Sequence, residues 1–120
     1  DIFKNKQITK CFISPEQGLY QGIDFMEKFI EKRVQANQIV HAIIPDTPLA
    51  SKLKAEAHAK KRFVKVVPDK KFNFNISFYC TNSKLYIVDF EKNLTGILID
   101  SQKTAKSMEA IFDMCWDMLD

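Results

Sequence analysis

The residues best suited to chemistry lie in one short segment, residues 82–89, with the sequence NSKLYIVD. The amine of Lys84 can bind phosphate oxygens, and the carboxylate of Asp89 can orient an imidazole ring. Two residues before the lysine stands Asn82, and an amide is not a useful nucleophile at neutral pH. The segment therefore predicts binding of a polar or anionic group without its cleavage.

The spacing of this segment resembles the phospholipase D motif, in which His-x-Lys is followed by four residues and an aspartate. Gly96 lies where that motif usually continues with a glycine. In the active family the histidine attacks phosphorus and forms a covalent intermediate. Asn82 stands at the histidine position, so the resemblance implies a binding domain descended from a catalytic one. The alternative is purely structural: Asn82 and Ser83 are common turn residues, and Lys84 would then be a solvated residue at the start of an apolar strand.

Length and composition predict one globular domain spanning residues 1–120. The chain is 46% hydrophobic and contains ten phenylalanines, which is typical of a packed core and not of disorder. Its apolar runs are shorter than the roughly 20 residues needed to span a bilayer, so we expect no membrane association. The chain begins with Asp1 and has no secretory signal pattern, so we expect a fragment of a longer protein.

The cysteines and histidines argue against a metal centre or a disulfide framework. Cys11, Cys80 and Cys115 are odd in number and far apart, without the paired spacing of zinc ligands. Each lies in a hydrophobic run, where free cysteine packs as a small apolar residue, and this pattern favours a reducing cytoplasm. His41 and His58 are too few for a metal cluster. We therefore expect neither a metal nor a cofactor.

The net charge is only +3, but the charges are unevenly distributed. Eight of the eighteen basic residues lie between Lys52 and Lys71, whereas no basic residue follows Lys106. Such segments are typical of solvated helix faces and strand edges. The alternative is a basic surface that faces an anion or an acidic partner.

Capping residues and apolar periodicity predict three helices. Ser14 and Thr47 are each followed by proline, which is favoured at the first helical position. We expect one helix to follow Ser14 and end at Asn37, and a second, lysine-rich helix to end near Ala59. Ser101 caps the third helix. The predicted buried stripe of that helix consists of Ala105, Met108, Phe112, Cys115 and Leu119.

Six strands are predicted, over residues 8–14, 39–44, 62–67, 72–80, 84–90 and 94–99. Early alternation of strands and helices, followed by four consecutive strands, predicts a mixed sheet with helices packed on it. The expected fold class is therefore α/β, with a mixed β-sheet of about six strands and three helices.

Several aromatic residues have both a packing and a functional interpretation. His41 lies inside an apolar strand and Trp116 lies beside the apolar stripe of the last helix, where packing is favoured over ligand binding. Phe72, Phe74 and Phe78 alternate along one predicted strand and would share one face. That pattern is typical of a core, although with the nearby lysines it could also stack nucleic-acid bases.

The order of several segments resembles the phospholipase D-like C-terminal domain of TrmB-type transcription regulators of archaea and bacteria. The segments that carry the resemblance are residues 33–44, the turn 45–48, and residues 73–90, 96–99 and 110–116. The resemblance covers nearly the whole chain and implies a phospholipase D-like half domain. It also implies that an upstream winged helix, absent from this chain, binds DNA. The longer sugar-binding region of the best known members has no counterpart here, so a sugar ligand does not carry over.

We therefore expect a non-catalytic effector-sensing and dimerisation domain of a transcription regulator, acting as a homodimer. A small polar or anionic effector would bind near Asn82, Lys84 and Asp89. The backbone N–H groups at the helix start of Asp46 and Thr47 could face the same ligand. Two alternatives stay open. One is a phosphodiesterase or nuclease with one motif per subunit, inactivated by a natural or engineered asparagine at position 82, and the other is a dimerisation module without a ligand.

Overall fold

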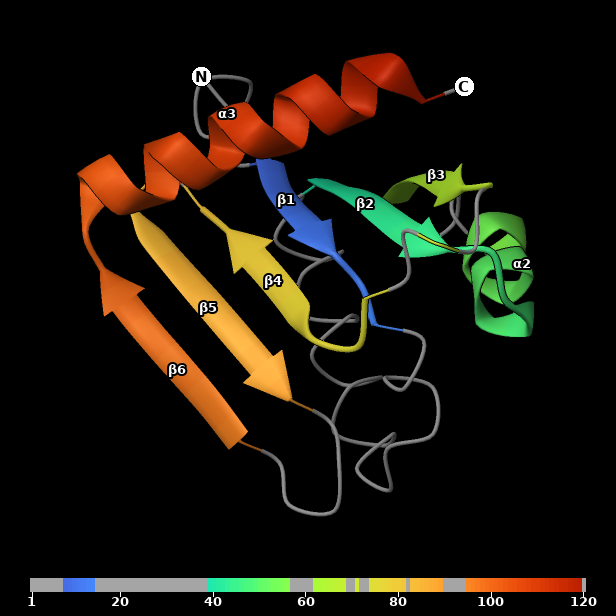
Figure 1. Cartoon of the computed structure of the whole chain (residues 1–120), viewed down its shortest axis with the longest axis horizontal. Helices are drawn as coiled ribbons and strands as arrows, with labels where there is room; N and C mark the ends of the chain where they lie inside the picture. The colour runs from blue at the N-terminus through green and yellow to red at the C-terminus, as the bar shows by residue number, and fades with distance from the viewer. Residues whose placement is uncertain are drawn as a thin grey trace.

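A computed structural model describes residues 8–14, 39–56, 62–68, 71, 74–81, 83–89 and 95–119 of the chain (Figure 1). These residues form one mixed sheet of six strands and two helices, which confirms the expected α/β class. The predicted helix that follows Ser14 lies outside the described residues. The elements are β1 (Ile8–Phe12), β2 (Ile39–Pro45), α2 (Pro48–Ala55), β3 (Arg62–Val67), β4 (Ser77–Cys80), β5 (Lys84–Asp89), β6 (Thr95–Asp100) and α3 (Gln102–Met118).

The strand order in the sheet is β3-β2-β1-β4-β5-β6, so the first strand of the chain lies near the middle. The strands β1, β2 and β3 are parallel, whereas β4, β5 and β6 pair antiparallel with their neighbours. The connections explain part of this division, because α2 carries the chain from β2 across to a parallel β3, whereas β4, β5 and β6 follow one another without a helix and pair antiparallel. The continuous apolar run of β2 is almost entirely buried, as expected for a strand covered on both faces.

Both helix starts in the described part of the chain confirm the predicted caps. Thr47 Oγ1 accepts a hydrogen bond of 3.3 Å from the backbone N–H of Ala50, and Pro48 opens α2. Ser101 Oγ accepts one of 3.2 Å from the backbone N–H of Thr104 in α3. Each hydroxyl satisfies a backbone donor that the first helical turn leaves without a partner.

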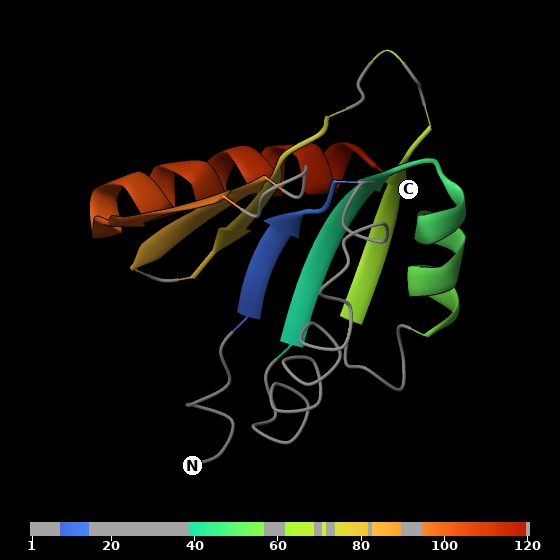
Figure 2. The same cartoon turned by 90° about the horizontal axis from the view of Figure 1, so that it is seen from below.

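The two helices pack on opposite faces of the sheet. Val64 and Val66 of β3 pack against the core on the α2 side, whereas Lys65 between them donates hydrogen bonds to the end of α3. Successive side chains of a strand point to opposite faces, so the two helices must lie on different sides. Figures 1 and 2 show α3 running across the sheet and α2 beside β3.

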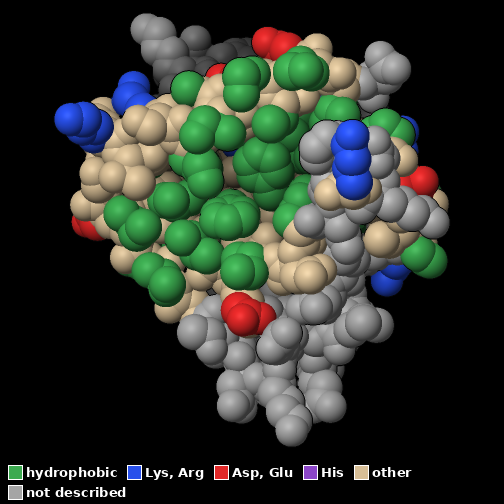
Figure 3. All heavy atoms as spheres, in the orientation of Figure 1, with side chains coloured by type: hydrophobic (Ala, Val, Ile, Leu, Met, Phe, Trp, Pro, Cys, Tyr) green, Lys and Arg blue, Asp and Glu red, His purple; other side chains and the backbone are tan. Residues whose placement is uncertain are grey.

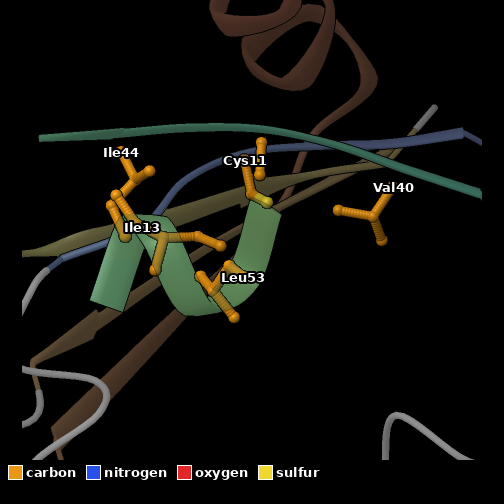
Figure 4. Packing of buried hydrophobic residues seen from close by; sticks show 7 residues of the cluster. Cys11, Ile13, Val40, Ile44 and Leu53 are labelled. Carbon is orange, nitrogen blue, oxygen red and sulfur yellow. The ribbon is translucent and has the colours of Figure 1, made fainter. Parts of the chain in front are cut away.

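The core on the α2 face joins β1, β2 and the helix (Figure 4). Its buried members are small or branched apolar residues, which fit between closely packed backbones. They are Cys11, Ile13, Val40, Ala42, Ile44, Ala50 and Leu53.

Phe12 is the centre of the aromatic packing on the α3 face. Its ring lies 5.3 Å from Phe112 of α3, 5.7 Å from Phe74 and 6.3 Å from Phe78, in edge-to-face geometry. The predicted strand over residues 72–80 is too long, because β4 contains only Ser77–Cys80. Phe74 therefore packs from outside the strand, and Phe72 lies outside the described residues. The rings of Phe74 and Phe78 are used in packing, as the core interpretation predicted.

Candidate functional site

Lys84 begins β5, directly after the turn that joins β4 to β5. The backbone N–H of Thr81 donates a hydrogen bond of 3.0 Å to the carbonyl oxygen of Lys84, and the N–H of Lys84 donates one of 3.2 Å to Thr81 Oγ1. These bonds close the hairpin and fix the backbone at the lysine. The side chain of Lys84 is half-buried, and its Cα lies opposite that of Asp100 in β6. Asn82 lies outside the described residues.

The two motif residues Lys84 and Asp89 are separated by the whole length of β5. They are its first and last residues. Five steps along an extended strand span about 16 Å. An odd number of steps also places the two side chains on opposite faces of the sheet. Within one chain, a single small ligand therefore cannot contact both groups.

Asp46 and Thr47 lie at the end of the sheet that carries Asp89, not Lys84. The strands β2 and β5 run in the same direction, so their C-terminal ends lie at the same end of the sheet. Asp89 ends β5, and Asp46 and Thr47 directly follow β2. The strands β1 and β4 separate β2 from β5, a distance of about 14 Å across the sheet. The hydroxyl of Thr47 is already used as the helix cap, and Asp46 is exposed. The predicted residues that the structure describes therefore occupy three separate places.

A second group of polar and aromatic side chains surrounds the end of α3. His41 stacks on Trp116 at 4.9 Å with an interplanar angle of 11°, and its ring edge meets Phe63 at 5.4 Å. Burial, and secondarily the positive charge of Lys10, lower the pKa of His41 below its ordinary value. His41 and Trp116 are packing partners, as the sequence predicted.

The acidic side of α3 is partly neutralised within the chain. Lys10 Nζ lies 2.7 Å from Asp113 Oδ1 and 3.3 Å from Glu109 Oε1. Burial alone would lower the pKa of Lys10, but its hydrogen bonds and charge interactions with Asp113 and Glu109 outweigh burial and raise it. These ion pairs attach α3 to β1, so the two carboxylates do not form a free acidic surface.

Arg62 is the most unusual polar residue of the described chain. It is only 5% exposed, and its Nε and Nη1 atoms are buried without a hydrogen-bond partner among the described residues. The sequence placed it in the basic segment between Lys52 and Lys71, for which a solvated face was the expected structure. Lys52 and Lys71 are exposed, as expected, but Arg62 points into the protein. The only local signal is its type, because Arg62 is the one arginine among the eight basic residues of that segment.

The remaining reactive groups do not form a catalytic or metal centre in the described part of the chain. No three metal-binding side chains come together there. Burial raises the pKa of the Cys80 thiol to about 11, which keeps it protonated and unreactive at neutral pH. None of the described helices is long and apolar enough to cross a membrane.

Comparison with known proteins links the fold to a DNA-binding protein. No family model matches the chain, and no curated protein matches it. The solved structure of TrmBL2 is similar, with a TM-score of 0.60 and 11% sequence identity. TrmBL2 is described as an archaeal chromatin protein that shows a novel mode of DNA binding.

The similarity covers 99% of this chain and 47% of TrmBL2. The chain thus spans about half the length of that protein. At this identity the likeness shows a shared fold, which agrees with the TrmB-type resemblance in the sequence. It does not bear on the phospholipase D-like part of that resemblance.

Proposed function

We propose that this chain is a non-catalytic regulatory domain of a TrmB-type transcription regulator, which senses an effector and pairs with a second copy of itself. The observation that carries the proposal is the fold similarity to TrmBL2 over 99% of the chain. More than half of TrmBL2 has no counterpart here, which leaves room for a separate DNA-binding segment in the longer protein. In this proposal DNA is bound by that segment and not by the sheet.

Binding without catalysis fits the chemistry of residues 82–89. Asn82 offers an amide where a phosphodiesterase needs an imidazole nucleophile. The missing nucleophile therefore disfavours the phosphodiesterase alternative.

The sheet edge formed by β6 supports self-association. Strand β5 is an interior strand, so the surface nearest to Lys84 that can accept another strand is β6. Ile97 and Leu98 are 56% and 53% exposed, and they point to opposite faces of the sheet. Figure 3 shows hydrophobic side chains gathered on the α3 face over this half of the sheet. An apolar edge strand of this kind is a template for pairing with another strand.

A two-fold axis perpendicular to the sheet would pair β6 antiparallel with its copy and keep both α3 helices on the same side. With Leu98 at the axis, each Asp100 lies opposite Gly96 of the other copy. The two carboxylates are then about 13 Å apart along the strands, so their repulsion is small. The middle of the edge carries no charge, which makes it complementary to itself.

The effector proposal retains Asn82, Lys84 and Asp89 as candidate ligand contacts. Lys84 and Asp89 are now two separate candidate positions, one at each end of β5. Calorimetry with a panel of phosphates and sugars tests it on the wild type, Lys84→Ala and Asp89→Asn. Loss of binding in only one variant would place the ligand at that end of β5. Lys106→Ala, an exposed change on α3, is the control for an unspecific charge effect. If no compound binds, the ligand-free dimerisation module is the better description.

DNA binding by the longer gene product tests the regulator role. We expect a mobility shift with that product and none with residues 1–120 alone. A longer product without DNA affinity, or full affinity in the isolated domain, would contradict the proposal.

A further inference from the structure

The guanidinium of Arg62 is a buried charge without a visible counterion. Arg62 is 5% exposed, and two of its three side-chain nitrogens lack a hydrogen-bond partner among the described residues. The carboxylates of Glu109 and Asp113 form their ion pairs with Lys10, not with Arg62. Arginine side chains stay protonated in proteins, so the free-energy cost of burying this charge cannot be avoided by loss of a proton. A buried, unpaired charge is strongly destabilising, and such a group calls for an explanation.

The side chain lies on the α2 face, at the start of β3. Val64 and Val66 pack against the core on this face, and residue 62 has the same orientation because it is two residues earlier. The Cα of Arg62 lies opposite that of Val40 in β2. Figure 4 shows Val40 on the α2 side of the sheet but away from the helix itself. The guanidinium therefore belongs to the part of this face that α2 does not cover.

Tyr79 gives Arg62 a polar neighbour on the same face. Tyr79 packs against the core cluster of that face. Burial raises the pKa of its phenol, and the positive charge of Arg62 partly opposes this rise. Tyr79 lies on β4, so the strands β2 and β1 separate it from Arg62 on this face. The phenol already has a hydrogen-bond partner in Ser77, so the guanidinium is the polar group of this face that has room for an oxyanion partner.

We propose that Arg62 is an oxyanion-binding residue and that the ligand of this domain carries a carboxylate or phosphate group that pairs with its guanidinium. The planar guanidinium of arginine matches the geometry of both groups. Either group also supplies the negative countercharge that the buried guanidinium lacks, which a neutral polyol cannot do. The site lies four strands from Lys84, about 19 Å across the sheet, so the two positions are independent. The inference depends on the proposed effector-sensing role only for its biological purpose, because anion binding can be measured without DNA.

The test compares thermal unfolding of wild type and Arg62→Met in chloride, inorganic phosphate and acetate at equal ionic strength. We expect phosphate or acetate to raise the melting temperature of the wild type by several degrees, in a concentration-dependent manner. Arg62→Met should melt higher than the wild type in chloride, because methionine fills the site without a buried charge. It should lose the response to either anion, with binding weakened about tenfold or more. The difference between phosphate and acetate identifies the group that the ligand carries.

Lys106→Met is the matched control, since it removes an exposed lysine of α3, on the other face of the sheet, and should retain the anion response. Arg62→Lys keeps the charge without the fork and should respond weakly. Three outcomes would overturn the inference: a wild type that responds to neither anion, an Arg62→Met that still responds, or an Arg62→Met that unfolds or melts lower in chloride. The last would show that the arginine is paired within the chain. None of these outcomes affects DNA binding by the longer protein, which tests the proposed function separately.

Discussion

Lys65 of β3 holds the end of α3 through Trp116. Its Nζ donates a hydrogen bond of 2.8 Å to the backbone carbonyl oxygen of Trp116 and another of 3.0 Å to that of Leu119, and it lies 4.7 Å from the centre of the indole ring. The last turn of α3 contains no basic residue of its own. Lys65 therefore supplies the positive charge and the donors that the end of a helix needs.

We predict that Lys65→Met lowers the free energy of unfolding by about 1–2 kcal/mol, through loss of these hydrogen bonds and of the charge at the helix end. Urea unfolding of the two proteins measures the difference. Lys103→Met is the control, because Lys103 is exposed in the first turn of α3, where a positive charge is not favoured. Equal losses in both variants would show that Lys65 acts only as a surface charge.

The stacked His41 predicts a pH dependence of stability. Its pKa is lowered in the folded protein, first by burial and then by Lys10, whereas Asp113 opposes and Lys65 adds to the lowering. In the unfolded chain its pKa returns to about 6.5, so the unfolded state takes up the proton first as the pH falls. The contribution of His41 is therefore present above about pH 6.5 and is lost as the pH falls toward the folded pKa.

Urea unfolding between about pH 5 and 8 checks this on wild type and His41→Phe, a change that keeps a ring beside Trp116. The wild type should lose more stability than the variant at the acidic end. His58 is present in both proteins, so it cancels in the comparison. Parallel pH curves would mean that His41 has the same pKa in the folded and unfolded states.

Self-association through β6 predicts that Leu98→Lys produces a monomer. A lysine on an edge strand opposes pairing with another strand, because its charge would be buried between the copies. Light scattering at high micromolar concentration should give a mass of 13.9 kDa for the variant and twice that for the wild type. Met118→Lys introduces the same charge at a residue that is 80% exposed on α3, and it should remain a dimer. A monomeric wild type would contradict the interface.

We predict no phosphodiesterase activity with a chromogenic phosphodiester. Without a histidine nucleophile at position 82, a residual rate would have to come from binding alone. Turnover that survives purification and disappears in Lys84→Ala would contradict this prediction and restore the enzyme alternative.

Local sequence determined most of the elements of this protein. The hydroxyls of Thr47 and Ser101, each placed before a helical segment, act within three residues, so their roles could be predicted without knowing the fold. The strand over Arg62–Val67 was predicted at its observed bounds. The length of β4 was not, because Phe74 packs on Phe12 of β1 instead of continuing the strand.

Only the tertiary structure decided how the polar residues are used. The spacing of Lys84 and Asp89 along the chain indicated one site, but an extended strand places them at opposite ends and on opposite faces. The contact of Lys65 with Trp116 joins residues 51 positions apart, which no local pattern predicts. Arg62 belongs to a segment whose other basic residues are lysines, and its burial depends on which strands lie beside β3. Sequence periodicity reports which side chains share a face, whereas burial and pairing depend on what the rest of the chain places against that face.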